Sequence, residues 1–273
     1  MIQGSFVSTV LALCLALPAP TATDPAAPAP AAAERGELRP AVSSLVEELQ
    51  QELGRRVVDE ARAKRLVEKL AAEFAVSGTR ERAPIVRVLE RCLAAKSQGK
   101  PDGELVCHAA RALAGMAPES LPVLERALDN KVLLKEKEVG RTLVLALGKT
   151  RDKSATKTLL DLLDNPDETI AAAAGEALGE YEGANLALRK QLFDEALKAL
   201  LQAKEEKDSQ VQHTLDPNSP HDAAALKRYE LLESAFGTTL QRLSKQDARS
   251  AELWLRWWNK NKRADWDDKS KLS

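Results

Sequence analysis

The sequence predicts an all-α fold of antiparallel helix pairs stacked into a solenoid, and three observations carry this prediction. Ala and Leu supply much of the apolar content, whereas Ile occurs only at positions 2, 85 and 170. Ala and Leu favour helices, while β-branched residues favour strands. An Ala-Leu dipeptide recurs at residues 112–113, 146–147 and 177–178, at intervals of 34 and 31 residues. The apolar residues around these dipeptides follow the three- and four-residue spacing of a helical face.

Composition excludes several other classes of protein. Among 273 residues, 40 Lys and Arg almost balance 41 Asp and Glu, which argues against a general nucleic-acid binder. Three cysteines are too few for a disulfide-stapled small domain or a zinc ribbon. No apolar run reaches the roughly 18–20 residues of a membrane span. We therefore predict no nucleic-acid partner, no membrane span in the mature chain, no cofactor and no metal.

Residues 1–22 have the pattern of a signal peptide. Residues 6–17 are uninterrupted apolar sequence, followed by small residues and prolines that permit cleavage after Ala19 or Ala22. Two features differ from the common pattern. Residues 1–22 hold no Lys or Arg, and the residues before Cys14 resemble the lipoprotein signal motif poorly. We predict an exported protein, periplasmic or extracellular, with lipoprotein anchoring or a retained membrane anchor as alternatives.

The remaining chain divides by composition. Residues 23–37 are rich in Pro and Ala, and proline at this density predicts a disordered linker that favours extended polyproline II. Residues 38–246 are predicted to form the solenoid. Residues 247–273 are predicted to form a Trp-rich C-terminal cap and tail.

Each repeat unit consists of two predicted helices. An aliphatic residue precedes each Ala-Leu dipeptide by seven positions, and a second amphipathic segment lies upstream of it. These upstream segments lie at residues 85–92, 121–128 and 159–163. One such pair cannot enclose a core, so neighbouring pairs must stack. Beyond residue 183 the period ends, and the sequence predicts longer helices over 186–207, 221–236 and 247–260.

Local signals mark the predicted helix ends. Asn165 is expected to be an N-cap, with Pro166 at the first helical position and Glu168 at the third. Gly148 and Gly179 are expected to end helices in the left-handed conformation. Small Ala residues at matched positions would let the inner helices approach closely.

Residues 159–179 resemble a HEAT repeat of the short kind, about 30 residues long, that is also called PBS-lyase HEAT-like. The resemblance is carried by LLDLLDNPD at 159–167, then Ile170, Ala174 and Ala-Leu-Gly at 177–179. It covers residues 80–183 clearly and 38–77 loosely. It implies a right-handed α-α superhelix of the armadillo type, used mostly as a binding scaffold and without catalytic residues. The family usually has Val-Arg where this chain has Ile170-Ala171, so the Asp–Arg ladder between repeats is in doubt.

The four tryptophans all lie in the final 20 residues, and Trp254, Trp257 and Trp258 share one helical face. We favour the interpretation that they cover the apolar end of the last repeat, since solenoid ends need capping. Their burial would contribute several kcal/mol, at roughly 1.5–3 for each large apolar side chain. The alternative is an aromatic platform for a sugar or a peptide. Its polar contacts would come from Lys260, Lys262 and Arg263.

Cys92 and Cys107 are the two cysteines that remain after signal removal, an even number for an oxidising compartment. They flank the predicted turn at 97–103 almost symmetrically, and closing this loop with a disulfide would add about 3 kcal/mol. The helical wheel, however, places Cys107 nearly opposite the apolar stripe of its own helix. We therefore favour two separate thiols over a disulfide. A metal site with His108 lacks both ligand number and ligand spacing.

Three further motifs are interpreted as structural. Gly-Lys-Thr at 148–150 lacks the glycine five residues earlier that a phosphate loop needs. The acidic residues within 164–168 lack the glycine of a calcium loop and suit a helix start. His213 and His221 accompany no recognisable nucleophile motif. The sequence thus predicts no catalytic, cofactor-binding or metal-ligating residue.

Charge is distributed unevenly, with a net +6 over residues 55–100 and −5 over residues 102–182. We interpret this mainly as solvated helix faces, with electrostatic choice of partner as the alternative. The predicted function is a non-catalytic, exported scaffold that binds a protein or peptide. One alternative is a lyase-type enzyme or chaperone, since some HEAT-like relatives attach or remove tetrapyrroles. Another is DNA binding, as in HEAT-like glycosylases, which export would nearly exclude.

Overall fold

The computed structural model of the chain describes residues 38–97, 100–213 and 220–268. The predicted signal peptide and linker lie outside these residues. The described helices are α1 (Pro40–Leu53), α2 (Glu60–Val76), α3 (Thr79–Leu93), α4 (Gly103–Leu113), α5 (Leu121–Asp129), α6 (Lys131–Leu134), α7 (Lys137–Lys149), α8 (Ala155–Asp161), α9 (Glu168–Leu178), α10 (Leu186–His213), α11 (Pro220–Ser244) and α12 (Ala251–Asn261). Two short strands, β1 (Lys96–Ser97) and β2 (Lys100–Pro101), pair antiparallel within the turn between α3 and α4. The all-α prediction is confirmed.

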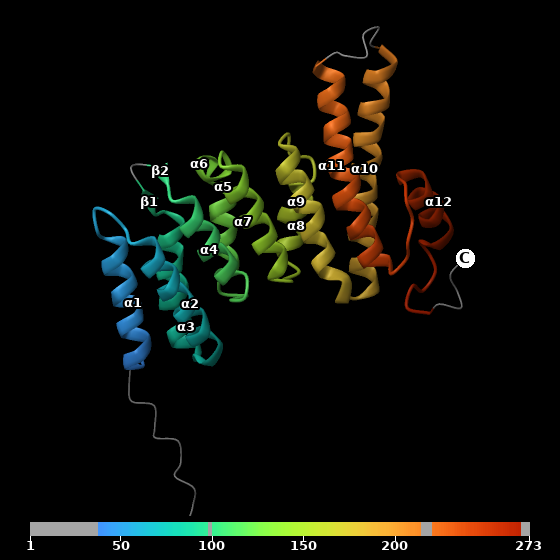
Figure 1. Ribbon diagram of the computed structural model, residues 1–273. Helices are drawn as coiled ribbons and strands as arrows, with labels where there is room; N and C mark the ends of the chain where they lie inside the picture. The colour runs from blue at the N-terminus through green and yellow to red at the C-terminus, as the bar shows by residue number, and fades with distance from the viewer. Residues whose placement is uncertain (1–37, 98–99, 214–219, 269–273) are drawn as a thin grey trace, which may run out of the picture. The chain divides into compact units, whose positions relative to one another are not determined.

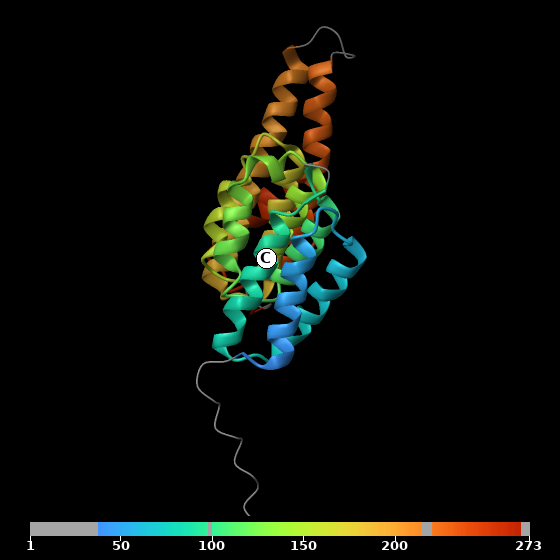
Figure 2. The same cartoon turned by 90° about the vertical axis from the view of Figure 1, so that its left-hand side faces the viewer.

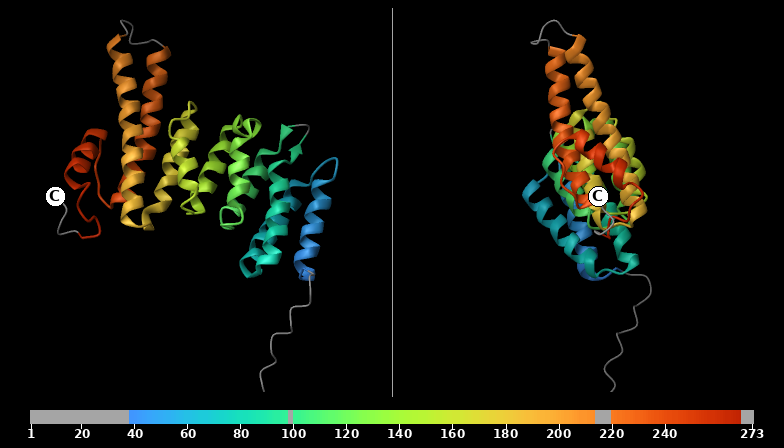
Figure 3. Two further views of the ribbon diagram at one scale, coloured as in Figure 1. Left: turned by 180° about the vertical axis from the view of Figure 1, so that it is seen from behind. Right: turned by 90° about the vertical axis from the view of Figure 1, so that its right-hand side faces the viewer.

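The helices from α1 to α12 follow one another as a two-layer stack (Figures 1 and 3). In the layer that we call layer B, α2, α4, α7, α9 and α11 each pack against the next. In layer A, α1 packs against α3, α3 against α5, and α8 and α12 pack against α10. Each layer-A helix before α12 also contacts the layer-B helix that follows it, as α1 does α2 and α10 does α11. This arrangement confirms the predicted HEAT-like solenoid of antiparallel pairs.

Aspartates begin several layer-B helices. The side chains of Asp59, Asp102 and Asp167 accept hydrogen bonds from backbone N–H groups of the first turn of α2, α4 and α9. The prediction that Asn165 is the N-cap is therefore wrong, because the cap of α9 is Asp167, two residues later. Oδ1 of Asn165 instead accepts a hydrogen bond of 2.9 Å from the N–H of Asp167, which holds the turn before the helix.

The expected left-handed conformations of Gly148 and Gly179 are also wrong. Gly148 lies inside α7, and Gly179 has φ −62° and ψ −23°, which is right-handed. Space explains Gly148 instead, because a methyl group there would lie 2.5 Å from Cβ of Ala177 and 2.8 Å from its Cα. The glycine that ends one repeat motif thus lets the alanine of the next motif come into backbone contact.

The α10–α11 hairpin is longer than the sequence predicts, since α10 extends to His213 and α11 to Ser244. Its far end projects beyond the ends of the neighbouring helices (Figures 1 and 2). Arg228 of α11 fastens it to the preceding repeat by donating hydrogen bonds of 3.2 Å to the backbone oxygens of Asn165 and Pro166. At its base, buried Phe193 and Phe236 belong to the core that runs through the stack.

Candidate functional site

Layer B carries two grooves, both lined by its helices. The N-terminal groove has a volume of about 600 Å³ and lies across α2, α4 and α7. Its wall is mostly charged, and Cys107 lies beside His108 in it. The other lining groups include Glu60, Lys64, Glu104, Arg111, Glu136 and Glu138.

The C-terminal groove has a volume of about 480 Å³ and lies across α7, α9 and α11. Its apolar lining comes from Leu145, Leu231 and Ala235, and Leu231 is 39% exposed. Lys149 also lines it, and this side chain has no ion pair or hydrogen bond within the described part of the chain. The groove therefore offers apolar contact beside one unpaired cation.

Ion pairs cross each boundary between neighbouring helices of layer B, the last one through Glu180 in the short 3-10 helix (Gly179–Gly183) that follows α9. The atoms joined are Lys64 Nζ and Glu104 Oε2, Arg111 Nη2 and Glu138 Oε1, Arg141 Nη2 and Glu176 Oε2, and Arg242 Nη1 and Glu180 Oε1. The Arg141 pair is the shortest of the Arg–Glu pairs, at 2.7 Å. The Asp–Arg ladder that the Ile170-Ala171 departure put in doubt is thus replaced by a ladder of Lys or Arg with Glu. Its partners are separated by unequal stretches of sequence, and all of α10 lies between Glu180 and Arg242, so no regular spacing marks the pairs and sequence reasoning missed them.

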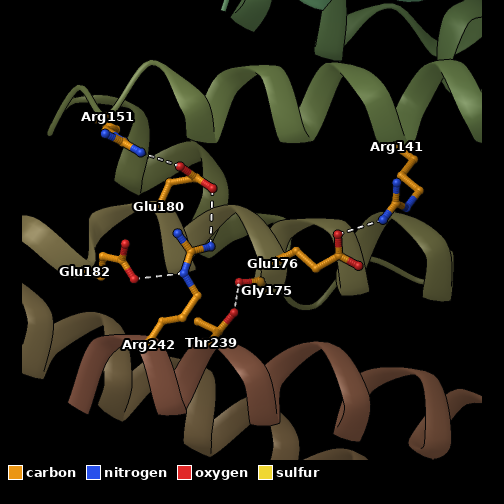
Figure 4. A network of polar contacts seen from close by, with 8 residues as sticks. All are labelled: Arg141, Arg151, Gly175, Glu176, Glu180, Glu182, Thr239 and Arg242. Carbon is orange, nitrogen blue, oxygen red and sulfur yellow. Dashed lines mark hydrogen bonds and ion pairs between the residues drawn. The ribbon is translucent and has the colours of Figure 1, made fainter. Parts of the chain in front are cut away.

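Glu180 is the centre of a denser network at the C-terminal groove (Figure 4). Its two carboxylate oxygens accept hydrogen bonds from Arg151, at 3.0 Å, and from Arg242, at 3.3 Å, while Arg242 also binds Glu182. Partial burial acts to raise the pKa of Glu180, but the two arginines outweigh it and hold this pKa below its usual value. Behind the network, Thr239 Oγ1 donates to the backbone oxygen of Gly175 at 2.8 Å. The network fixes α11 against α9.

The tryptophans surround one phenylalanine, Phe193 of α10. Its ring centroid lies 5.7 Å from Trp254, 5.4 Å from Trp257, 5.2 Å from Trp258 and 5.3 Å from Trp266. Trp254 and Trp266 are buried, whereas Trp257 and Trp258 are half-buried. Sequence reasoning missed Phe193 and placed Trp266 outside the cluster.

Arg189, which sequence reasoning also missed, fastens the segment after α12. It is 2% exposed, and its Nε donates to the backbone oxygen of Leu243 at 2.8 Å. Its Nη1 pairs with Asp267 at 2.8 Å, and this bond holds the pKa of Asp267 below its usual value. Beside it, Trp266 Nε1 donates to the backbone oxygen of Asn261 at 2.9 Å. Trp266 and Asp267 are therefore held against the base of α10 by Arg189.

The two cysteines are free, buried thiols in the structure. Cys92 is fully buried, and this burial raises the pKa of its thiol to about 12. Cys107 Sγ lies 3.8 Å from the backbone oxygen of Glu138. His108 Nε2 lies 3.4 Å from Glu68 Oε1, which turns the imidazole toward α2. The structure therefore gives Cys107 and His108 different neighbours.

The remaining sequence motifs lie at helix ends or outside the described side chains. Gly-Lys-Thr at 148–150 ends α7, and Asp167 caps α9. Among the residues that the structure describes, no group of three or more His, Cys, Asp or Glu is arranged to hold a metal ion. The side chains of His213 and His221 lie outside the described part.

Comparison with known families identifies HEAT repeats at residues 89–179 and 131–215. This match confirms the resemblance seen at residues 80–183. No curated protein and no solved structure matches the chain. None of the described helices is both long and apolar enough to cross a membrane. HEAT repeats are a fold of the kind that serves as a scaffold for protein interactions.

Proposed function

Because the chain carries HEAT repeats, we propose that it is an exported, non-catalytic scaffold that binds a protein or peptide partner along layer B. The observation that carries the proposal is the position of the two grooves. Both are lined by layer-B helices, and α7 contributes to each of them. One extended segment of a partner can therefore contact both grooves by crossing α7.

Rigidity supports the same function. The cross-repeat ion pairs and the close contact of Gly148 with Ala177 hold neighbouring helices in fixed register. A binding surface that is already ordered loses less conformational freedom when a partner docks. The apolar side chains Leu145 and Leu231 supply buried contact area, and Lys149 supplies a charge for orientation.

The second candidate is a lyase-type enzyme or chaperone, and the observation that favours it is Cys107 beside His108 in the N-terminal groove. Such chemistry needs a reactive thiol, whereas the Cys107 side chain is 5% exposed and faces a backbone oxygen. Alkylation of the native protein, followed by mass measurement, separates the two. Rapid labelling at Cys107 favours the enzyme, and its absence favours the scaffold.

Site-specific photo-crosslinking tests the scaffold proposal. A benzophenone amino acid is placed at Leu145 or Leu231 in the C-terminal groove, and at Asp129 or Asp161 on layer A as matched exposed controls. In the cells that make the protein, we expect a discrete crosslinked product from the groove positions and none from layer A. Crosslinks from layer A alone, or none from either groove position, would contradict binding along layer B.

A further inference from the structure

The outward face of α12 is a second surface, separate from layer B. This helix lies at the end of the stack opposite α1 (Figures 1 and 3). Its inward face buries Trp254 against Phe193. Its outward face exposes Leu253, at 45%, together with Arg256 and Lys260.

The cations of this surface have no partners. Arg256 and Lys260, and Lys262 and Arg263 just beyond the helix, form no ion pair or side-chain hydrogen bond with the described part of the chain. Three nearby carboxylates have other partners: Glu252 pairs with Lys204, Asp267 pairs with Arg189, and Asp265 Oδ1 accepts a hydrogen bond of 3.1 Å from the N–H of Asp267. In layer B, one cation is paired across each helix boundary, although Lys149 has no partner in the described part of the chain. The four cations at the C-terminal end of the stack are therefore without carboxylate partners in the described part of the chain.

The same surface has the composition of a protein interface. A helix that only closes a solenoid needs a polar outward face, whereas this one exposes leucine beside half-buried Trp257. Tryptophan and arginine are the residues that most often dominate binding at interfaces. Arg256 and Lys260 are one helical turn apart, about 6 Å along the axis, so two carboxylates of one chain can meet both.

We propose that the outward face of α12 docks an acidic segment of a partner protein, with aspartate or glutamate against Arg256 and Lys260 and an apolar side chain against Leu253 and Trp257. Charge complementarity selects the partner, because four cations here lack counter-ions on the described part of the chain. This surface acts independently of the proposed layer-B function, since it shares no residue with either groove.

A lipid surface fits this face less well than a peptide does. At 100° per residue, Leu253 and Leu255 lie on opposite edges of the outward arc, and Arg256 lies between them. The indole of Trp254 is turned inward against Phe193. A helix that inserts into a membrane needs one continuous apolar face, and the outward side of α12 has none.

Selection of peptides on the purified protein tests the proposal with a probe of defined chemistry. Random 12-residue peptides are selected, and affinities are measured from tryptophan fluorescence, since all four tryptophans lie in or beside α12. We expect enrichment of peptides rich in Asp and Glu that also carry an aliphatic or aromatic residue. The double substitution Arg256→Glu, Lys260→Glu should weaken their binding at least tenfold, and added NaCl should weaken it in the wild type.

The matched control is Arg87→Glu, Arg91→Glu on α3, an exposed pair of cations that are also one turn apart and without partners in the described part of the chain. It should change the affinity less than twofold, and circular dichroism should show both variants folded. Three results would overturn the proposal: no enrichment of acidic peptides, equal weakening by both double substitutions, or binding to phosphatidylglycerol vesicles in place of acidic peptides. Loss of the layer-B crosslinks leaves this test unaffected, so the two proposals fail separately.

Discussion

Replacement of Gly148 by alanine tests whether close backbone contact between repeats holds the stack together. The new Cβ would lie 2.5 Å from Cβ of Ala177 and 2.8 Å from both its Cα and its backbone oxygen. Carbon atoms in good contact are about 3.5–4 Å apart, so α7 and α9 must separate by about 1 Å. Two of the three obstructing atoms belong to the backbone, which a side-chain rotation cannot move.

The magnitude follows from two opposing effects. Overpacking costs about 1–3 kcal/mol, and exchange of glycine for alanine in a helix returns at most about 1 kcal/mol. Gly148→Ala should therefore lower the free energy of unfolding by about 1–2 kcal/mol. For a chain of this length, that corresponds to a Tm about 2–8 °C lower.

Gly237→Ala is the matched control for this measurement. Gly237 lies within α11, and a methyl group there would meet no heavy atom within 4 Å. This variant should be more stable than the wild type by about 0.5–1 kcal/mol, because only the helix preference acts. The assay is thermal and urea unfolding of both variants, followed by circular dichroism. Equal stabilisation by the two substitutions would refute the role of Gly148 in repeat packing.

Four further predictions concern the cluster, the thiols, pH and export. Phe193→Ala should cost about 3–5 kcal/mol and shift tryptophan emission to the red, because the ring contacts all four indoles; unchanged emission would contradict its central position. Cys92 should resist iodoacetamide in the native protein at pH 8, because burial raises the pKa of its thiol to about 12, and it should react once the protein is unfolded. A disulfide would show instead as a mass about 2 Da lower before reduction than after it, with no labelling of the unfolded, non-reduced protein. The hydrogen bond from Lys204 lowers the pKa of Glu252 to about 2 in the folded protein, below the value of about 4.3 in the unfolded chain. The Lys204–Glu252 pair therefore stabilises the fold above pH 4.3, and this stabilisation is lost as the pH falls toward 2. Between pH 6 and pH 3, the free energy of unfolding of Glu252→Gln, measured with urea, should fall less than that of the wild type. The difference between the two decreases should be at most about 1 kcal/mol. N-terminal sequencing of the exported protein should begin at Pro20 or Thr23, and an intact Met1 would contradict cleavage.

The periodic part of the fold could be predicted because the buried face of each repeat is formed by apolar residues at helical spacing within a short stretch of sequence. The Ala-Leu dipeptides at 146–147 and 177–178 lie in α7 and α9, the layer-B helices that pack together. Helix ends were harder to predict from the sequence, since Asn165 and Asp167 are both residue types that cap helices well, and the geometry of the turn determines which of them is the cap. Gly148 illustrates the same limit, because a glycine beside a helix end also suits a left-handed cap.

Contacts distant in sequence could not be predicted from local patterns. The three tryptophans of α12 share a face in the helical wheel, but nothing near them indicates Phe193, about 60 residues earlier. Arg189 looks like an ordinary surface residue of an amphipathic helix, yet it is buried beneath Asp267 and Trp266. Both depend on where the chain returns after α11, which the repeat period does not encode.

The two proposed surfaces differ in how their charges are used, and this difference sets the kind of partner each can select. Along layer B, Arg141 and Arg242 are held by glutamates of the neighbouring repeat and Lys149 is the unpaired cation of the C-terminal groove, so a partner there is selected mainly by shape and apolar contact, with one charge for orientation. On α12, Arg256 and Lys260 lack counter-ions within the described residues, so a partner is selected by its carboxylates. Added salt should therefore weaken docking at α12 strongly and docking along layer B only slightly. A partner that engages both surfaces would be guided first by the charge at the end of the stack and then held by the grooves.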